Sequence, residues 1–110
     1  MLALDDYVVD VLMRDLVGHD RRPVAFLVYL WLAAEQRRAE ERRGDDRRKD
    51  DTVQISYQAM AESIGVSKSS VQAAVSWLAR RKLLAVSKEN ATATPKYRVM
   101  TPWREKRKGR

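Results

Sequence analysis

Apolar residues recur at helical spacing in the first third of the chain. Between residues 4 and 17 they fall at Leu4, Tyr7, Val8, Val11, Leu12 and Leu16. This spacing, with acidic residues in the first turn, predicts an N-terminal helix over residues 4–17 that ends at Gly18. A second helix is expected to begin between Asp20 and Pro23, because proline is tolerated in a first turn. Its stretch 24–34 is apolar on nearly every face, so this helix should be buried on most sides.

A densely charged segment follows the second helix. It reads EQRRAEERRGDDRRKDD and contains no apolar residue beyond Ala39. The helix can continue to Arg43 on pairs of opposite charge and should end at Gly44. Residues 44–51 are then predicted to form a mobile charged loop without a binding role.

The second half of the chain changes its periodicity three times. The β-branched piece TVQIS predicts a short strand over residues 53–55. Helical spacing returns over residues 57–64, with Ser56 as a candidate cap, and over residues 68–82. The inward positions of the latter helix are Val71, Ala74, Val75 and Leu78. The stretch LLAVSKENATATPKYRVM then alternates apolar and polar residues around a polar turn, which predicts a β-hairpin.

The two helices of this half meet the spacing requirements of a helix-turn-helix unit. Ala61 is small at the point where the helices must cross closely. Gly65 tolerates the positive φ that ends the first helix abruptly. Val66 can fill the corner as an apolar contact, and Ser67 can cap the second helix through its hydroxyl.

These residues carry a resemblance to the winged helix-turn-helix DNA-binding proteins. The run GVSKSSVQAAVSWLARRKLLAV is similar to the turn, recognition helix and first wing strand of bacterial regulators of the GntR and MarR type. It also resembles the helix-turn-helix domains of plasmid and phage replication proteins, in which a long apolar helix precedes the unit. The resemblance covers residues 22–100 and implies a mainly α fold with a small β-hairpin. That fold is a three-helix core plus a wing, here with an extra N-terminal helix.

The sequence departs from this family pattern at two positions. Lys82 stands where a glycine commonly follows the recognition helix, so the helix either runs on or ends in a different cap. Trp77 stands where a polar residue is usual. It either marks a surface for a partner or packs against the extra N-terminal helix, and packing is the favoured interpretation.

The second helix of the unit is implied to enter the major groove, and its outward side chains are the candidates for DNA contact. The base-contact candidates are Ser69, Gln72, Ala73 and Ser76, whose hydroxyl, amide and methyl groups suit base edges. The phosphate-contact candidates are Ser67, Lys68, Arg80 and Arg81 on the helix and Lys88, Lys96 and Arg98 on the hairpin.

The positive charge is concentrated in the second half of the chain. The net charge is +7, yet residues 1–51 hold 10 Lys and Arg against 12 Asp and Glu, whereas residues 52–110 hold 12 against 3. A surface polarised in this way attracts polyanions, and nucleic acid is the commonest of them. The tail 103–110 has five basic residues and one acid and is predicted to be disordered, either as a phosphate-binding arm or as a plain charged end.

Composition excludes several classes of protein. There is no cysteine and a single histidine, His19, and no glycine-rich phosphate loop, metal-ligand spacing or paired carboxylates stand out. We therefore expect neither an enzyme nor a bound cofactor or metal. No secretory signal is apparent, and the longest apolar run, 23–34, is too short to span a bilayer. One soluble domain over residues 1–110 is expected, in the cytoplasm with the nucleoid and without a membrane partner.

The sequence thus predicts double-stranded DNA binding by a bacterial or phage and plasmid transcriptional regulator. The alternatives are the DNA-binding module of a replication initiator or partition protein, and a winged helix used for protein assembly. The apolar N-terminal helices also suggest a homodimer, whose two recognition helices would lie about 34 Å apart on a near-palindromic site. No small-molecule ligand is implied, because no separate ligand domain is present.

Overall fold

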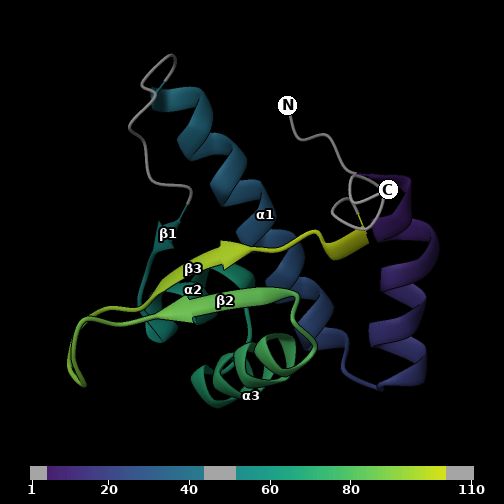
Figure 1. Cartoon of the computed structure of the whole chain (residues 1–110). Coiled ribbons are helices and arrows are strands. Elements are labelled where there is room, and N and C mark those ends of the chain that lie inside the picture. Colours follow the sequence, from purple (N-terminus) through teal and green to yellow (C-terminus); the bar gives the residue numbers. More distant parts are fainter. Residues whose placement is uncertain (1–4, 44–51, 104–110) are drawn as a thin grey trace.

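The computed structural model describes residues 5–43 and 52–103, which form a mainly helical fold with a small three-stranded antiparallel sheet (Figure 1). This confirms the expected class, a mainly α chain with a little β structure. The predicted charged loop at 44–51 and most of the predicted basic tail lie outside the described residues.

The N-terminal helix runs over residues 6–19 and is wound more widely than an α-helix. Two π-type segments, Val8–Leu12 and Arg14–His19, make up most of it. At its end the Asp20 amide donates to the Asp15 carbonyl, five residues back, at 2.8 Å. The prediction that Gly18 ends the helix is wrong, since Gly18 lies inside the last turn and no strained φ requires a glycine there.

The wide winding aligns residues that are four apart, because each turn takes more than the about 3.6 residues of an α-helix. Val8, Leu12 and Leu16 accordingly form one buried line, at 4, 3 and 0% exposure. They pack in the same core as the second helix.

Helix α1, Pro23–Arg43, is the long apolar helix that the sequence predicts. A tight corner precedes it, where Arg21 has a φ of 57° and the Arg22 amide donates to the Leu16 carbonyl at 2.8 Å. Its buried side chains are Ala25, Phe26, Val28, Tyr29 and Leu32. Figure 1 shows α1 between the N-terminal helix and the sheet, so its apolar faces can pack against both.

Helices α2, Tyr57–Ile64, and α3, Lys68–Arg80, meet at the predicted corner. The Ser56 and Ser67 hydroxyls accept the amides of Ala59 and Ser70, so each caps its helix as expected. Gly65 has a φ of 92°, and its amide and the next both donate to the Ala61 carbonyl. This is the left-handed ending for which glycine is favoured.

Helix α3 ends in the same way, but on a lysine. Lys82 has a φ of 61°, and its amide donates to the Ala79 carbonyl while the Leu83 amide donates to the Leu78 carbonyl. This pair of bonds is a Schellman motif with Lys82 in the left-handed position. The helix therefore ends at Arg80, two residues before the predicted boundary, and Lys82 adopts a conformation that favours glycine.

The sheet contains one more pairing than the sequence predicted. Strands β2, Leu84–Ser87, and β3, Lys96–Val99, form the expected hairpin. Strand β1, Val53–Gln54, pairs antiparallel with β3, so β3 lies in the centre. Tyr97 on β3 pairs with Val53 on one side and Val86 on the other and is 1% exposed.

Two tyrosines fix the sheet to the helices in different ways. The Tyr29 hydroxyl donates to the Met100 carbonyl at 2.9 Å, which ties α1 to the end of β3. The Tyr97 hydroxyl is buried and finds no hydrogen-bond partner among the described residues. Burial, with the neighbouring Tyr57, raises the pKa of Tyr97, so its ring serves the core as an apolar group.

Candidate nucleic-acid interface

The exposed side of α3 presents a row of short polar and small side chains beside one lysine. The inward residues Val71, Ala74, Val75 and Leu78 are all at most 4% exposed. The predicted contact residues Lys68, Ser69, Gln72, Ala73 and Ser76 are all exposed. The structure therefore brings these five side chains together on one solvent-facing surface, which we call the α3 face.

A serine cluster at the start of α3 holds the beginning of this face. The Ser67 hydroxyl accepts the Ser70 amide at 3.1 Å and donates to the Ser70 hydroxyl at 2.8 Å. The Ser69 hydroxyl lies 3.2 Å from it. Ser67 is thus engaged in capping, and Lys68 and Ser69 are the outward groups of this turn.

Trp77 lies half-buried where α3 meets the end of the N-terminal helix. Its indole N–H donates to the Asp20 carboxylate at 2.8 Å. The Arg22 guanidinium lies 4.4 Å above the ring, and that of Arg80 lies 5.7 Å from it. Trp77 therefore contacts the corner that follows the N-terminal helix, which favours packing over a surface for a partner, and it holds two arginines beside α3 through cation–π contacts.

Sequence reasoning missed the arginines that precede α1. Arg21 and Arg22 are exposed, and with Pro23 they border a hollow of about 190 Å³ whose other wall is Ser70 and Ala73 on α3. The sequence does contain a signal for them, because Arg21 and Arg22 form a pair of basic residues at the predicted start of a helix. Its position next to α3 follows only from the crossing of α1 and α3 in space.

The guanidinium of Arg81, another predicted phosphate contact, is already paired with two carboxylates. It lies 2.5 Å from the Asp15 carboxylate and 3.5 Å from that of Asp20. Both acids belong to the end of the N-terminal helix. We therefore assign Arg81 to the attachment of that helix and leave it out of the DNA surface proposed below.

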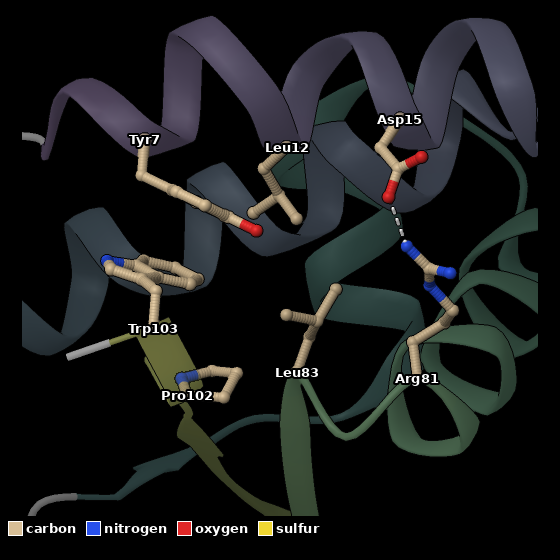
Figure 2. A pocket seen from close by; sticks show the side chains of 7 residues that line it. All are labelled: Tyr7, Leu12, Asp15, Arg81, Leu83, Pro102 and Trp103. Atoms are coloured by element: carbon tan, nitrogen blue, oxygen red, sulfur yellow. Dashed lines mark hydrogen bonds and ion pairs between the residues drawn. The ribbon is translucent and has the colours of Figure 1, made fainter. Parts of the chain in front are cut away.

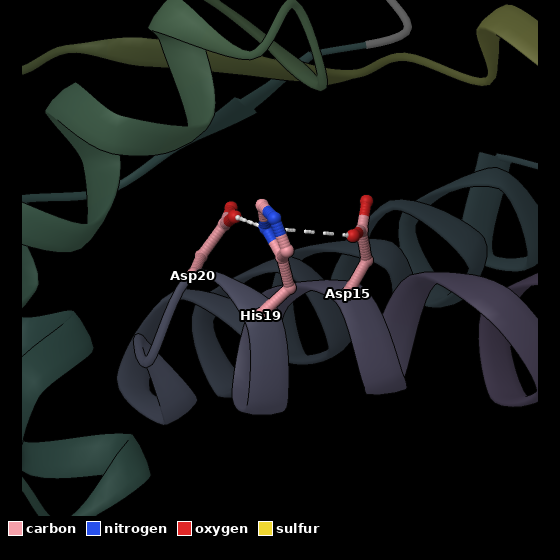
Figure 3. Close-up of side chains that lie close together, drawn as sticks. All are labelled: Asp15, His19 and Asp20. Atoms are coloured by element: carbon pink, nitrogen blue, oxygen red, sulfur yellow. Dashed lines mark hydrogen bonds and ion pairs between the residues drawn. The ribbon is translucent and has the colours of Figure 1, made fainter.

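Asp15, His19 and Asp20 gather at this attachment point (Figure 3). The Asp20 side chain is only 4% exposed, whereas the His19 side chain is 79% exposed and lies 3.0 Å from it. Burial acts to raise the pKa of Asp20, but the hydrogen bonds from His19 and Trp77 and the charge of Arg81 outweigh it and hold the pKa below its usual value. The hydrogen bond with Asp20 and the charges of Asp15 and Asp20 raise the pKa of His19.

The ligand atoms of this trio all lie within 4.8 Å of one another, a spacing that a metal ion can bridge. Both carboxylates, however, already contact the Arg81 guanidinium, and Asp20 also accepts the indole N–H. A cation would have to displace Arg81 to bind here. The arrangement is that of a neutralised ion-pair cluster, and we assign it to helix attachment.

The far end of the N-terminal helix is attached by aromatic packing. Tyr7 and Trp103 stack with ring centroids 4.6 Å apart, and the Trp103 indole N–H donates to the Asp5 carboxylate at 2.8 Å. Between this stack and the Asp15–Arg81 pair lies a cavity of about 390 Å³ (Figure 2). The helix is thus attached at both ends, and the cavity lies beside its buried line of apolar residues.

The β-hairpin places its basic residues around an exposed loop, which Figure 1 shows projecting from the sheet. Lys88 and Arg98 are exposed, and Lys96 is half-buried. Lys96 and Arg98 point away from the core, since Tyr97 and Val99 between and beyond them point inward. The three predicted hairpin residues therefore lie outside the core, on the hairpin, and are not part of the α3 face.

No protein-family model, curated protein or solved structure matches the chain. None of the described helices combines the length and the apolar character needed to cross a membrane. The α3 face and the cations around it are therefore the basis of the function proposed below.

Proposed function

We propose that the chain binds double-stranded DNA by placing α3 in the major groove. The observation that carries this proposal is the α3 face, where small and amide side chains stand on a helix flanked by cations. A helix can enter the major groove only if its outward side chains let it approach closely, and Gln72 can pair with adenine through two hydrogen bonds. Ser69, Ala73 and Ser76 complete the base-reading surface in this proposal.

Phosphate contacts would come from three places around this helix. Lys68 lies at its start, and Arg80 and Arg22 flank Trp77 at its far end. Lys88, Lys96 and Arg98 on the hairpin would contact the backbone beside the groove. Such contacts position a protein on DNA, whereas base contacts read the sequence.

The arrangement of elements supports a winged helix-turn-helix as the architecture of this site. Helices α1, α2 and α3 precede the hairpin, the corner between α2 and α3 is tight and capped, and the sheet order is β1-β3-β2. The left-handed conformation of Lys82 removes one of the two departures from the family pattern. We place the activity in transcription regulation, with replication initiation or partition as the alternative process for the same DNA contact.

Salt dependence of DNA binding tests the proposal. Fluorescence anisotropy with a random-sequence duplex should show affinity falling with added salt, with a logarithmic slope of about −5 for the six proposed cationic contacts. Lys68→Ala should reduce the slope by about 1. Arg38→Ala, which removes the same charge from the distant part of α1 where Arg38 pairs with Glu35, is the control and should leave the slope near that of the wild type.

Absence of binding even at low salt would contradict the DNA proposal and favour a winged helix that binds protein. Equal effects of the two substitutions would show that net charge, and not the α3 face, attracts the DNA.

A further inference from the structure

The N-terminal helix carries an apolar line that no described element covers. Six large apolar side chains of the described residues are exposed, and three of them follow one another on this helix at a spacing of four. They are Val9, Met13 and Val17, at 48, 39 and 39% exposure. Because the wide winding aligns residues four apart, they form one continuous stripe next to the buried line of Val8, Leu12 and Leu16.

This stripe faces away from the body of the molecule. Figure 1 shows the N-terminal helix at the edge of the fold, with α1 on one side and no described element on the other. Exposed apolar side chains that line up on one helix mark an interaction surface more often than isolated ones do. The stripe therefore needs an occupant.

Two charged residues beside the stripe indicate which occupant fits. Asp10 and Arg14 each follow a stripe residue directly, and both are exposed. Neither makes an ion pair or hydrogen bond with another described residue. A partner with a basic group opposite Asp10 and an acidic group opposite Arg14 would satisfy both charges.

A second copy of the same helix meets this requirement when it runs antiparallel. With Met13 on the two-fold axis, Val9 of each copy faces Val17 of the other. Asp10 of each copy then lies within about 3 Å, along the helix axis, of Arg14 of the other. A parallel pairing would set Asp10 against Asp10 and Arg14 against Arg14. A two-fold interface has to be self-complementary. The antiparallel arrangement sets two Asp10–Arg14 attractions against one Arg14–Arg14 repulsion at the same axial offset of about 3 Å, whereas the parallel arrangement sets only like charges level with each other.

We propose that the chain forms a homodimer through the antiparallel pairing of its N-terminal helices along Val9, Met13 and Val17. The two Asp10–Arg14 pairs set the direction and register of this interface. The inference does not rest on DNA binding, since a dimer that binds no DNA and a monomer that binds it are separate outcomes.

Sedimentation equilibrium of the full chain over a range of concentrations tests the proposal. The wild type should be a reversible dimer. Met13→Glu sets two carboxylates against each other on the axis and should raise the dissociation constant about 30-fold or more. Ala91→Glu, which adds the same charge to the exposed hairpin loop, should leave it unchanged. A wild type that stays monomeric at every concentration would overturn the proposal.

Charge reversal tests the register independently of the stripe. Asp10→Arg alone and Arg14→Asp alone each turn two attractions into repulsions and should raise the dissociation constant about 10-fold. An equimolar mixture of the two variants should form heterodimers about as tightly as the wild type, because one Asp10–Arg14 pair is then present as in the wild type and the other is restored with its charges exchanged. A mixture no tighter than either variant alone would show that the helices do not pair in this register. Both substitutions are at exposed positions, and circular dichroism should show unchanged helix content.

Discussion

Single residues set the ends of the two helices that form the corner of the site. Gly65 and Lys82 both adopt positive φ, at 92 and 61°, and both let a helix stop in a single turn. The first was predictable because only its own conformational freedom matters. At Lys82 the sequence leaves both a longer helix and a different cap open, since lysine itself does not favour positive φ. An L-residue in this region loses about 1 to 2 kcal/mol relative to the right-handed form.

We therefore predict that Lys82→Gly stabilises the chain. The gain should be about 0.5 to 1 kcal/mol, because glycine removes the strain but loses more backbone freedom on folding. Urea unfolding followed by circular dichroism measures it. Lys82→Ala is the control, since it removes the same side chain and charge but keeps the strained conformation, and it should give no comparable gain. Equal stabilisation by both would assign the effect to charge instead.

Other residue contacts show where sequence reasoning succeeds and where it stops. The caps at Ser56 and Ser67 were predicted because their partners lie three residues away. The bond from Trp77 to Asp20 spans 57 residues, and that from Arg81 to Asp15 spans 66. Long-range pairs of this kind depend on how the helices cross, so the sequence predicts a phosphate contact at Arg81 but not its pairing with Asp15 and Asp20.

At the scale of elements, the same distinction separates the hairpin from the third strand. The hairpin joins neighbouring segments, and its alternation predicted it. Strand β1 has only two residues, and its pairing with β3 depends on a chain that first passes through α2, α3 and β2. The wide winding of the N-terminal helix also escaped prediction. Its one sequence signal is the strict spacing of four between Val8, Leu12 and Leu16.

The attachment of the N-terminal helix should depend on pH through His19. Its pKa is raised from 6.5 in the folded chain, so its contribution to stability is fully present below pH 6.5 and is lost as the pH rises through the raised value. Asp20 has a lowered pKa, so its contribution is present above 3.8 and is lost as the pH falls through the lowered value. Attachment should therefore be strongest between about pH 4 and 6.5.

Thermal unfolding at a series of pH values checks this expectation against His19→Gln. The wild type should exceed the variant in melting temperature at pH 5 to 6, and the difference should shrink as the pH rises through the raised pKa of the imidazole, which then loses its charge. A difference that is constant across this range would contradict the assignment of His19 to the ion-pair cluster.

At the scale of the whole molecule, the charge asymmetry of the sequence acquires a spatial meaning. Acidic residues of the first half, Asp15 and Asp20, neutralise Arg81 at the back of α3, while Lys68, Arg22 and Arg80 remain around its exposed face. The fold therefore determines where the positive field that would attract DNA lies. The charges counted along the sequence place this field only in the second half of the chain.

The two proposals together constrain the DNA site. A dimer formed through the N-terminal helices carries two α3 faces related by a two-fold axis, so the bound sequence should have the same symmetry. The expected half-sites are about 34 Å, or one helical turn, apart. The composition of each half-site remains to be found by selection of duplexes from a random pool.

The most direct test of the central claim is the effect of Gln72→Ala on such a selected duplex, measured by fluorescence anisotropy beside random DNA. If α3 reads the major groove, the substitution should weaken binding to the selected site by about 1 to 3 kcal/mol, relax the preference at one base position and leave binding to random DNA unchanged. If Gln72→Ala binds the selected site as tightly and as selectively as the wild type, α3 does not read the sequence in the orientation proposed here.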